Sequence, residues 1–390
     1  MPRQITAVGA ISLLNEEMPV PQVRQHQADQ QPTPAVPGSK QRRLGNLALP
    51  AGLRAAGSRP AMADVARIAG VSHQTVSRVV NEVDRVRPAT RARVRAAIEQ
   101  LGYLPNVAAR ALATGRTRTV GVVTVASRLF GPASTLHGIE QAARAEGYFV
   151  TMVSLSSIDP GSVREAIGRL VAQGVDGVIV DVPLVSALGA IGQLSVDIPI
   201  VAVEGDPLGG VPVVSVDQVD GARQATEHLL SAGHATVWHV AGPHDWLETH
   251  GRIAGWRAAL VSAAAHVPPL LHGDWSAKSG YEAGRILASV DKVTAVFVAN
   301  DQMALDVLRA LHESGREVPT DVSVVGFDDI PEAAYTTPPL TTVRQDFDLV
   351  GRNSLRLMID QINTGRRQFN ALIVKSTLVV RESSGAIRTR

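Results

Sequence analysis

Residues 64–81, DVARIAGVSHQTVSRVVN, contain two short amphipathic segments separated by Gly70. Apolar residues in each segment are spaced to share one face of a helix, and the glycine stops the first segment. Ser72 is placed to cap the second helix, and the Gly-Val-Ser turn allows that helix to leave at a steep angle. The stretch therefore predicts a helix-turn-helix, a motif whose second helix can enter the major groove of DNA.

The polar side of the predicted second helix carries residue types that read base edges. Gln74 can pair with adenine and Arg78 with guanine, and His73 projects from the same side. Spacing alone leaves a second interpretation open, a three-helix scaffold with a solvated polar face, because such shapes also occur without DNA. Short hydroxyl side chains suited to phosphate contacts stand at Ser72, Thr75, Ser77 and Thr90.

The charges of the chain are divided unevenly around this motif. Residues 59–118 carry 11 basic and 4 acidic groups, and every basic group there is an arginine. Residues 119–390 carry 21 basic and 29 acidic groups. Arginine suits bidentate contacts with phosphate and guanine, so the short basic segment is the part expected to bind nucleic acid.

From residue 118 the pattern changes to short β-branched runs that alternate with amphipathic helices. Apolar strands between helices indicate parallel sheets buried on both faces, and about eight of them indicate an α/β fold of two doubly wound lobes. The runs are 119–125, 148–155, 175–182, 198–204, 211–217, 235–242, 295–300 and 322–328.

Three runs together resemble the lactose-repressor/galactose-repressor family of transcription regulators: VSHQTVSRVVN (71–81), TRARVRAAIEQLGYLPN (90–106) and ARALATG (109–115). The resemblance covers about residues 60–380. It implies a helix-turn-helix domain followed by a two-lobed core like that of periplasmic binding proteins. It also implies a homodimer that binds operator double-stranded DNA and a small-molecule effector, with repression as the usual mode. His73 and Arg87 depart from the Tyr and Ser that the family's lactose repressor has at these positions, so a different DNA half-site is expected.

The resemblance adds DNA contacts beyond the second helix. Asn81 is implied as a further contact, and residues 104–115 resemble a hinge helix that orders only on operator DNA. Leu112 would then be the apolar wedge between two dimer mates in a minor groove, supported by Asn106 and Ala109. The alternative is a plain interdomain linker.

Polar residues follow the apolar strands where a doubly wound fold binds its ligands. Glu204, Asn300 and Asp328 stand at carboxyl ends of predicted strands, the edge at which ligands bind in open parallel sheets. Arg252 and Gln345 add polar groups, and the face of Trp275 can pack on a pyranose ring. This set of residues predicts a site for a sugar or glycoside.

The resemblance assigns ligand contacts to Arg252, Asn300, Asp328 and Gln345. It also implies apolar contacts from Trp275 and Phe347 and, near the mouth of the cleft, from Leu129 and Pro132. Glu204 stands where the family has an aspartate, and Asp181 replaces an amide. Each residue also has a structural interpretation: Asn300 as a helix cap, Asp328 as an acceptor of loop amides, Trp275 as a core residue.

Two other classes of protein, an enzyme and an exported sugar-binding protein, are alternatives to a regulator. An enzyme would need a motif such as G-x-G-x-x-G after a strand, a phosphate-binding loop or H-E-x-x-H, and none occurs. His234 and His239 are expected to be turn and strand residues rather than catalytic bases. His244, Asp245 and His250 cluster but lack metal-site spacing to a third ligand, so no catalytic residue, metal or cofactor is predicted. An exported sugar-binding protein would need a signal peptide and would lack residues 59–118.

The remaining expectations concern organisation and location. Residues 1–58 predict an irregular, disordered extension, because they show no apolar period. The domains expected after it are 59–104 for DNA binding, 105–117 for the hinge and 118–390 for effector binding and dimerisation. The polar C-terminal stretch without heptad leucines favours a dimer over a tetramer. No apolar run is long enough to span a bilayer, and the chain has no cysteine, which fits a cytoplasmic protein.

Overall fold

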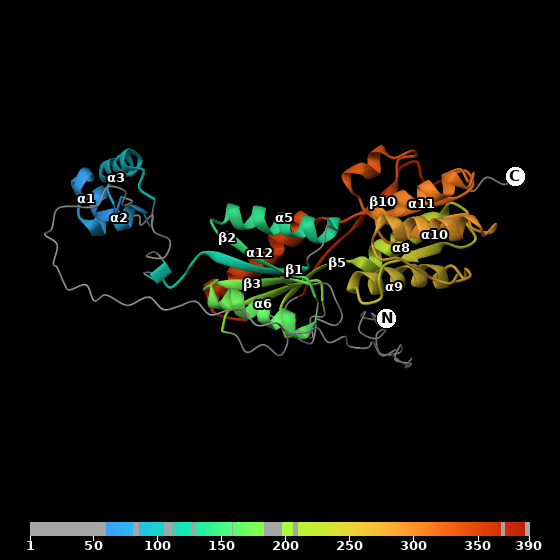
Figure 1. The fold of residues 1–390 in the computed structure, drawn as a ribbon, viewed down its shortest axis with the longest axis horizontal. Coiled ribbons are helices and arrows are strands. Elements are labelled where there is room, and N and C mark those ends of the chain that lie inside the picture. Colours follow the sequence, from blue (N-terminus) through green and yellow to red (C-terminus); the bar gives the residue numbers. More distant parts are fainter. Residues whose placement is uncertain are drawn as a thin grey trace, which may run out of the picture. The chain divides into compact units, whose positions relative to one another are not determined.

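Figure 1 shows the computed structural model of the chain. The predicted N-terminal extension, residues 1–58, lies outside the residues that the structure describes. In the described part of the chain no helix is both long and apolar enough to cross a membrane. The described residues are 60–80, 86–104, 111–112, 114–125, 129–157, 159–182, 197–205, 210–367 and 371–386.

Three helices form the predicted helix-turn-helix unit. Helix α1 (Met62–Ala69) ends at Gly70, whose φ of 62° lies in the left-handed region that glycine adopts without strain. Helix α2 (His73–Val80) begins after Ser72, whose Oγ accepts a hydrogen bond from the backbone N–H of Thr75 at 3.2 Å. The third helix, α3, spans Pro88–Leu101. The three helices share a small core of Val65, Ala66, Ala69, Val76, Val79, Val94, Ala97 and Tyr103.

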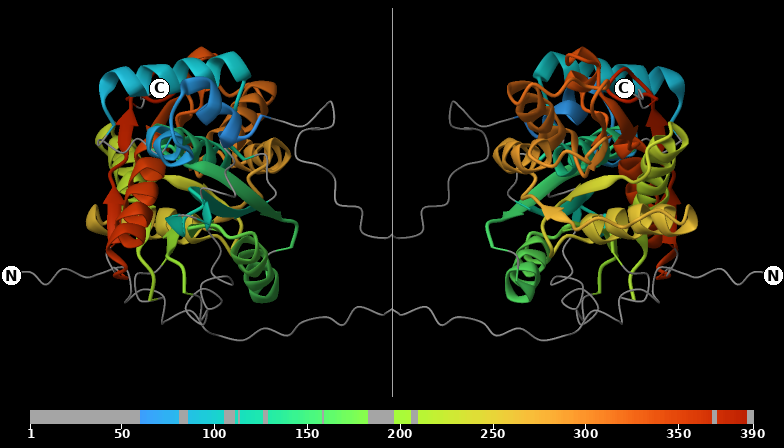
Figure 2. Two further views of the ribbon diagram at one scale, coloured as in Figure 1. Left: turned by 90° about the vertical axis from the view of Figure 1, so that its left-hand side faces the viewer. Right: turned by 90° about the vertical axis from the view of Figure 1, so that its right-hand side faces the viewer.

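The N-lobe, defined here as residues 119–216 and 346–374, contains a parallel sheet in the order β11-β5-β4-β3-β1-β2. Val120 and Val122 of β1 point to one face, toward α5 and α12, and Val123 and Val125 point to the other, toward α6. Figure 2 shows α6 in green and α12 in red on different sides of these strands. The elements are β1 (Thr119–Val125), α5 (Phe130–Ala145), β2 (Phe149–Leu155), α6 (Pro160–Ala172), β3 (Gly177–Asp181), β4 (Ile200–Val203), β5 (Val213–Val216), α12 (Phe347–Thr364) and β11 (Ala371–Val374).

The C-lobe, residues 217–345 and 375–386, repeats this arrangement around a sheet in the order β12-β10-β9-β8-β6-β7. Its strands pair in parallel except for β10 and β12. Helices α8 and α9 cover one face and α10 and α11 the other. The elements are α8 (Gln218–Ser231), β6 (Trp238–Ala241), α9 (Leu247–Ser262), β7 (Leu271–His272), α10 (Ala277–Ala288), β8 (Ala295–Val298), α11 (Asp301–Glu313), β9 (Ser323–Asp328), the 3-10 helix η3 (Pro331–Tyr335), β10 (Thr341–Arg344) and β12 (Thr377–Val379).

The chain passes between the lobes three times, so neither lobe is one continuous segment. The crossings follow β5, β10 and β11, and they bring residues 217–218, 345–346 and 375–376 to the junctions. A change in how the lobes are arranged must therefore involve the backbone at these three crossings.

The eight strands predicted from the sequence are all present, but two parts of that prediction were incomplete or wrong. Four further strands of 2–4 residues, β7, β10, β11 and β12, were not predicted. Strand β2 is not buried on both faces. It lies at the edge of the N-lobe sheet, where Phe149 and Met152 are 64% and 54% exposed.

Candidate functional site

Helix α2 presents the predicted base-reading residues to solvent. Val76 and Val79 are buried in the three-helix core, and His73, Gln74 and Arg78 are exposed. Ser72 is exposed as well, and Thr75, Ser77 and Thr90 are partly buried. The three predicted base-reading side chains are therefore accessible to a major groove, as the helix-turn-helix prediction requires.

The predicted hinge falls largely outside the described residues. Asn81, Asn106 and Ala109 all belong to segments that the structure does not describe. Ala111, Leu112 and Thr114 are helical, and Leu112 is 90% exposed. An apolar side chain this exposed is available for insertion between base pairs. Its role as a wedge stays a prediction.

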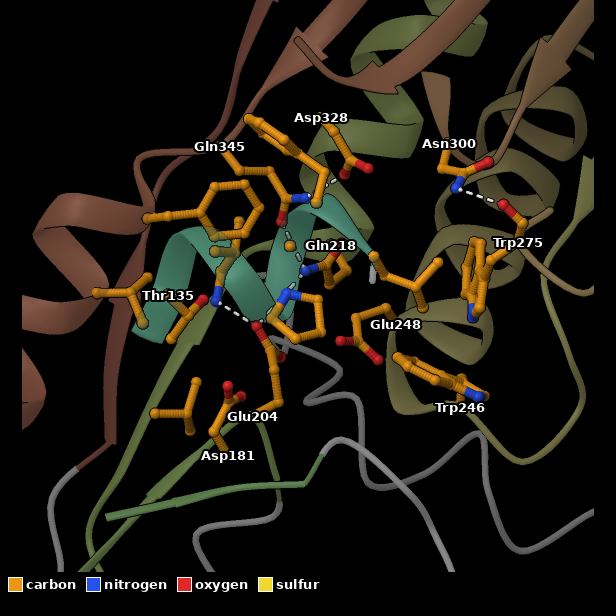
Figure 3. Close-up of a pocket in the computed structure, with 18 of the residues that line it drawn as sticks. Thr135, Asp181, Glu204, Gln218, Trp246, Glu248, Trp275, Asn300, Asp328 and Gln345 are labelled. Carbon is orange, nitrogen blue, oxygen red and sulfur yellow. Dashed lines mark hydrogen bonds between the residues drawn. The ribbon is translucent and has the colours of Figure 1, made fainter. Parts of the chain in front are cut away.

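A cavity of about 580 Å³ is lined by residues of both lobes. Figure 3 shows Asp181 and Glu204 of the N-lobe on one side of it and Asp328 and Gln345 on the opposite side. All ten predicted ligand residues line it: Leu129, Pro132, Asp181, Glu204, Arg252, Trp275, Asn300, Asp328, Gln345 and Phe347.

Arg252 is the centre of the polar network in the C-lobe half of the cavity. It is only 4% exposed, and its Nε donates to Oε1 of Gln218 at 2.9 Å. One terminal nitrogen donates to the carbonyl oxygen of Ala299, and the other lies 3.8 Å from Oδ1 of Asp328. Burial lowers the pKa of Arg252 but leaves it the cation of this network. The guanidinium also lies 4.0 Å from the ring centre of Phe327, which fixes its plane.

Two glutamines extend this hydrogen-bond network to the places where the chain crosses between the lobes. Nε2 of Gln218 donates to Oε1 of Gln345 at 3.0 Å, and Nε2 of Gln345 donates to Oδ1 of Asp328 at 2.6 Å. Gln218 stands at the crossing after β5 and Gln345 at the crossing after β10. A ligand that contacts Asp328 or Gln345 therefore acts on groups that are hydrogen-bonded across two of the crossings.

The N-lobe half of the cavity holds two carboxyl groups that face each other. Burial and, to a smaller extent, the charge of Glu204 raise the pKa of Asp181 to about 7. Burial also raises the pKa of Glu204 to about 7, although its Oε1 accepts a hydrogen bond from the backbone N–H of Val216 at 2.9 Å. Near neutral pH these carboxyls are partly protonated, so together they can both donate to and accept from ligand hydroxyls.

Aromatic rings line the cavity from both lobes. Trp275 is 5% exposed and meets Trp246 edge to face, with ring centres 5.6 Å apart. Phe130 and Phe347 of the N-lobe form a second edge-to-face pair at 5.9 Å. Apolar ring faces together with several polar groups are what binding of a sugar requires.

Three residues that line the cavity have strained backbones. Glu204, Trp275 and Asp328 have φ of 55°, 71° and 113°, which are rare for side chains with a Cβ. Six non-glycine residues in the described part have positive φ, and half of them line this cavity. Strain of this kind concentrates at functional sites, where the surrounding structure holds a side chain in place.

Comparison with known proteins connects both parts of the chain with one family. Residues 61–106 match the family described as bacterial regulatory proteins, lacI family, and residues 226–384 match the periplasmic binding protein-like domain. The HTH-type transcriptional regulator CelR of Thermobifida fusca is 40% identical over 343 residues, covering 83% of this chain and 98% of CelR. The lactose operon repressor of Escherichia coli (strain K12) is 35% identical over 331 residues, covering 84% of this chain and 91% of the repressor. The chain belongs to the LacI family.

Solved structures of LacI-family proteins have the same fold. The Lac repressor dimer bound to operator and the anti-inducer ONPF matches with a TM-score of 0.76 and 34% identity, over 84% of this chain and all of that one. The complex of the transcriptional regulator CelR with cellobiose matches with a TM-score of 0.62 and 36% identity, over 83% of this chain and all of that one. The predicted family, the fold and the class of transcriptional regulator are thus confirmed.

The sequence did not identify every residue of this LacI-family cavity. Gln218 lies two residues after the end of β5, so the rule that found Glu204 could also have found it. Trp246 and Glu248 lie beyond a loop that follows β6, where no periodicity marks them. Asn300 and Trp275 combine a structural role with a place in the cavity, since Oδ1 of Asn300 caps α11 and its Nδ2 donates to the carbonyl of Trp275 at 3.2 Å. The residues missed were Phe130, Gly131, Thr135, Val203, Val216, Gln218, Trp246, Glu248 and Val350.

The histidines that were weighed as catalytic candidates have structural partners. His239 is fully buried in β6, stacks on Phe297 at 4.5 Å and pairs through Nδ1 with the carbonyl of that residue. Burial lowers the pKa of His239 to about 3. His234 contacts the hydroxyls of Thr294 and Ser323. The structural interpretation accounts for both.

Proposed function

We propose that this LacI-family chain is a repressor that binds a pseudo-palindromic operator as a homodimer and is released by a sugar or glycoside bound between its lobes. It acts in the bacterial cytoplasm and has no catalytic activity. Helix α2 reads bases through Gln74 and Arg78, and residues 105–117 form the hinge. CelR, a relative over most of its length, has been solved with cellobiose, which supports a saccharide as the effector.

One observation carries the proposal: the hydrogen bonds among Arg252, Gln218, Gln345 and Asp328 join the cavity to two lobe crossings. A ligand that competes for these groups has different contacts in different lobe arrangements, and only such a difference can shift the equilibrium between them. The shift would separate the two hinge segments of the dimer, so the DNA is released. Because coupling is reciprocal, operator DNA must weaken saccharide binding by the same factor.

The effector part is tested with a panel of neutral mono- and disaccharides. Thermal-shift screening identifies those that bind, and each is added to the protein bound to fluorescent DNA from upstream of its own gene. We expect at least one to raise the melting temperature and to weaken DNA binding about tenfold or more, within the usual range of allosteric coupling. A saccharide that binds without changing DNA affinity would refute release by that saccharide.

The DNA part is tested with Arg78→Ala, and Arg67→Ala is the control. Both side chains are exposed, but only Arg78 lies on α2. A bidentate guanine contact is worth about 1–3 kcal/mol per half-site, so Arg78→Ala should lower the ratio of specific to non-specific affinity. Arg67→Ala should leave that ratio unchanged. An unchanged ratio in Arg78→Ala would remove this residue from base reading.

A further inference from the structure

One corner of the cavity, formed by Trp246, Glu248 and Trp275, contains polar atoms without partners. Oε2 of Glu248 and Nε1 of Trp275 are both buried from solvent, and neither has a hydrogen-bond partner among the described residues. Figure 3 shows Glu248 near the middle of the view, with Trp246 and Trp275 beside it. Buried polar atoms are normally satisfied, so this corner is where a bound molecule would supply the missing contacts.

The local structure holds these side chains in place. Trp246 is the N-cap residue of α9, and Glu248 lies in the first turn of that helix, where the free N–H groups stabilise a carboxylate. Trp275 lies against the end of β6 because residue 242 is glycine, where any Cβ would come within 2.2 Å of the indole. The corner is therefore rigid in the absence of a ligand.

The corner is surrounded by carboxyl groups, which accept hydrogen bonds when they are ionised. Glu248 of the C-lobe faces Asp181 and Glu204 of the N-lobe, and burial followed by the charge of Glu204 raises its pKa. The described part of the chain offers Glu248 no ion-pair partner, because Arg252 is held by Gln218, Ala299 and Asp328. In its ionised form Glu248 has a free acceptor at Oε2, to which a ligand hydroxyl that enters here can donate.

We propose that Glu248 determines effector specificity by accepting, through Oε2, a hydrogen bond from a hydroxyl of the saccharide ring that packs on Trp275. The inference rests on the proposed function, because it assumes a saccharide effector. A site built to hydrogen-bond a hydroxyl discriminates strongly against an analogue that lacks it, since the buried acceptor is then left unpaired. Glu248 thus distinguishes sugars by the position of one hydroxyl.

The test combines variants of the protein with variants of the ligand. Cellobiose, lactose and their monodeoxy derivatives are measured by calorimetry against the wild type, Glu248→Ala, Glu248→Gln and the control Glu282→Ala, an exposed residue of α10. For the wild type, one deoxy position of the disaccharide that binds should weaken binding about tenfold or more. In Glu248→Ala the parent sugar should bind about as weakly as that deoxy sugar does, and removing the hydroxyl should cost nothing further.

The glutamine variant separates a hydroxyl from a charged donor. Gln keeps an acceptor oxygen, so Glu248→Gln should bind the parent sugar within about fivefold of the wild type. A preference for the 2-amino analogue of glucose that this variant abolishes would identify an ammonium partner and overturn the hydroxyl assignment.

Two failures are distinguishable. A disaccharide that binds the wild type but shows the same deoxy penalties in Glu248→Ala and Glu248→Gln overturns the role of Glu248 and leaves the proposed function intact. If neither disaccharide binds the wild type while other panel sugars do, the same cycle is run on the monodeoxy forms of the strongest binder. Binding of no saccharide at all refutes the effector class, and the role of Glu248 with it.

Discussion

The N-lobe and the C-lobe are built on six-stranded sheets of the same design, but their halves of the cavity differ. In the C-lobe half, Arg252, Asp328 and Gln345 are joined by ion-pair and hydrogen-bond contacts, and the unpartnered atoms of that half lie at the corner of Glu248 and Trp275. In the N-lobe half, Asp181 has only a 3.5 Å contact with Thr124, and its neighbour Glu204 repels it. The C-lobe half is thus preorganised, and the N-lobe half depends on protons or a ligand. Substitutions of the polar residues should therefore lower the free energy of unfolding in the C-lobe half and raise it in the N-lobe half.

Arg252→Ala should have the largest effect. It removes the cation that pairs with buried Asp328 and leaves Oε1 of Gln218 and the carbonyl of Ala299 without this donor, and breaking a buried pair in this way costs about 3–5 kcal/mol of the free energy of unfolding. The response to saccharide should be lost and operator affinity retained, because Arg252 lies in the core and not on α2. Denaturant unfolding and DNA-binding anisotropy measure the two effects.

Arg316→Ala is the matched control for that experiment. Arg316 is also in the C-lobe and donates to the carbonyl of Val293 at 2.6 Å, but it does not line the cavity. This variant should keep the saccharide response. If folded Arg252→Ala loses DNA binding or still responds fully to the saccharide, the assignment of the cavity is wrong.

The carboxyl pair of the N-lobe should make stability depend on pH. In the folded chain the pKa values of Asp181 and Glu204 are both about 7, above their ordinary values of 3.8 and 4.5. The folded state therefore binds more protons than the unfolded state between about pH 4 and 7. The stability that this gives is fully present below about pH 4 and is lost as pH rises through 7. The free energy of unfolding of the double variant Asp181→Asn/Glu204→Gln should exceed that of the wild type at pH 8 by several kcal/mol, and the difference should shrink toward pH 4.

Melting temperatures across pH 4–8 test this prediction. Each single variant should show more than half of the double variant's increase in stability at pH 8, because removing one carboxyl also removes its repulsion of the other. Identical pH profiles for the wild type and the double variant would show that the two groups do not share a buried environment.

The sequence was informative where one simple rule connects a residue with its position. Glu204, Asn300 and Asp328 each lie at or just beyond the carboxyl end of a strand, and this edge of a parallel sheet brings such residues together. Glu248 escaped this rule because its place depends on how α9 starts after a loop. The positive φ of Trp275 also depends on tertiary packing and has no local signal. For α2 the sequence predicted which side chains are exposed, but base contacts require DNA to be observed.

The lobes also differ at their edges, and this difference bears on the proposed dimer. At one edge the N-lobe sheet ends in β2, a strand of seven residues on which Met152 is exposed. The C-lobe sheet ends instead in β7, which has only two residues. A long apolar edge favours contact with another chain. Met152→Glu should weaken self-association about tenfold, or roughly 1.4 kcal/mol, in sedimentation experiments. Val261→Glu, an equally exposed apolar site on α9 of the C-lobe, should leave it unchanged. Equal effects of both would argue against β2 as the dimer edge.

Away from the cavity the lobes should behave alike, and their exposed ion pairs give the smallest expected effects. Glu165 and Arg169 of α6 in the N-lobe lie 2.5 Å apart, and Lys278 and Glu282 of α10 in the C-lobe lie 3.7 Å apart. Both pairs have i,i+4 spacing, which is worth about 0.2–0.5 kcal/mol, and the order with the acid first is the better one. Double-mutant cycles to alanine should thus give a slightly larger coupling on α6, and both couplings should fall in high salt because exposed charges are screened. A coupling above about 1 kcal/mol on either helix would contradict the view that the difference between the lobes is confined to the cavity and the β2 edge.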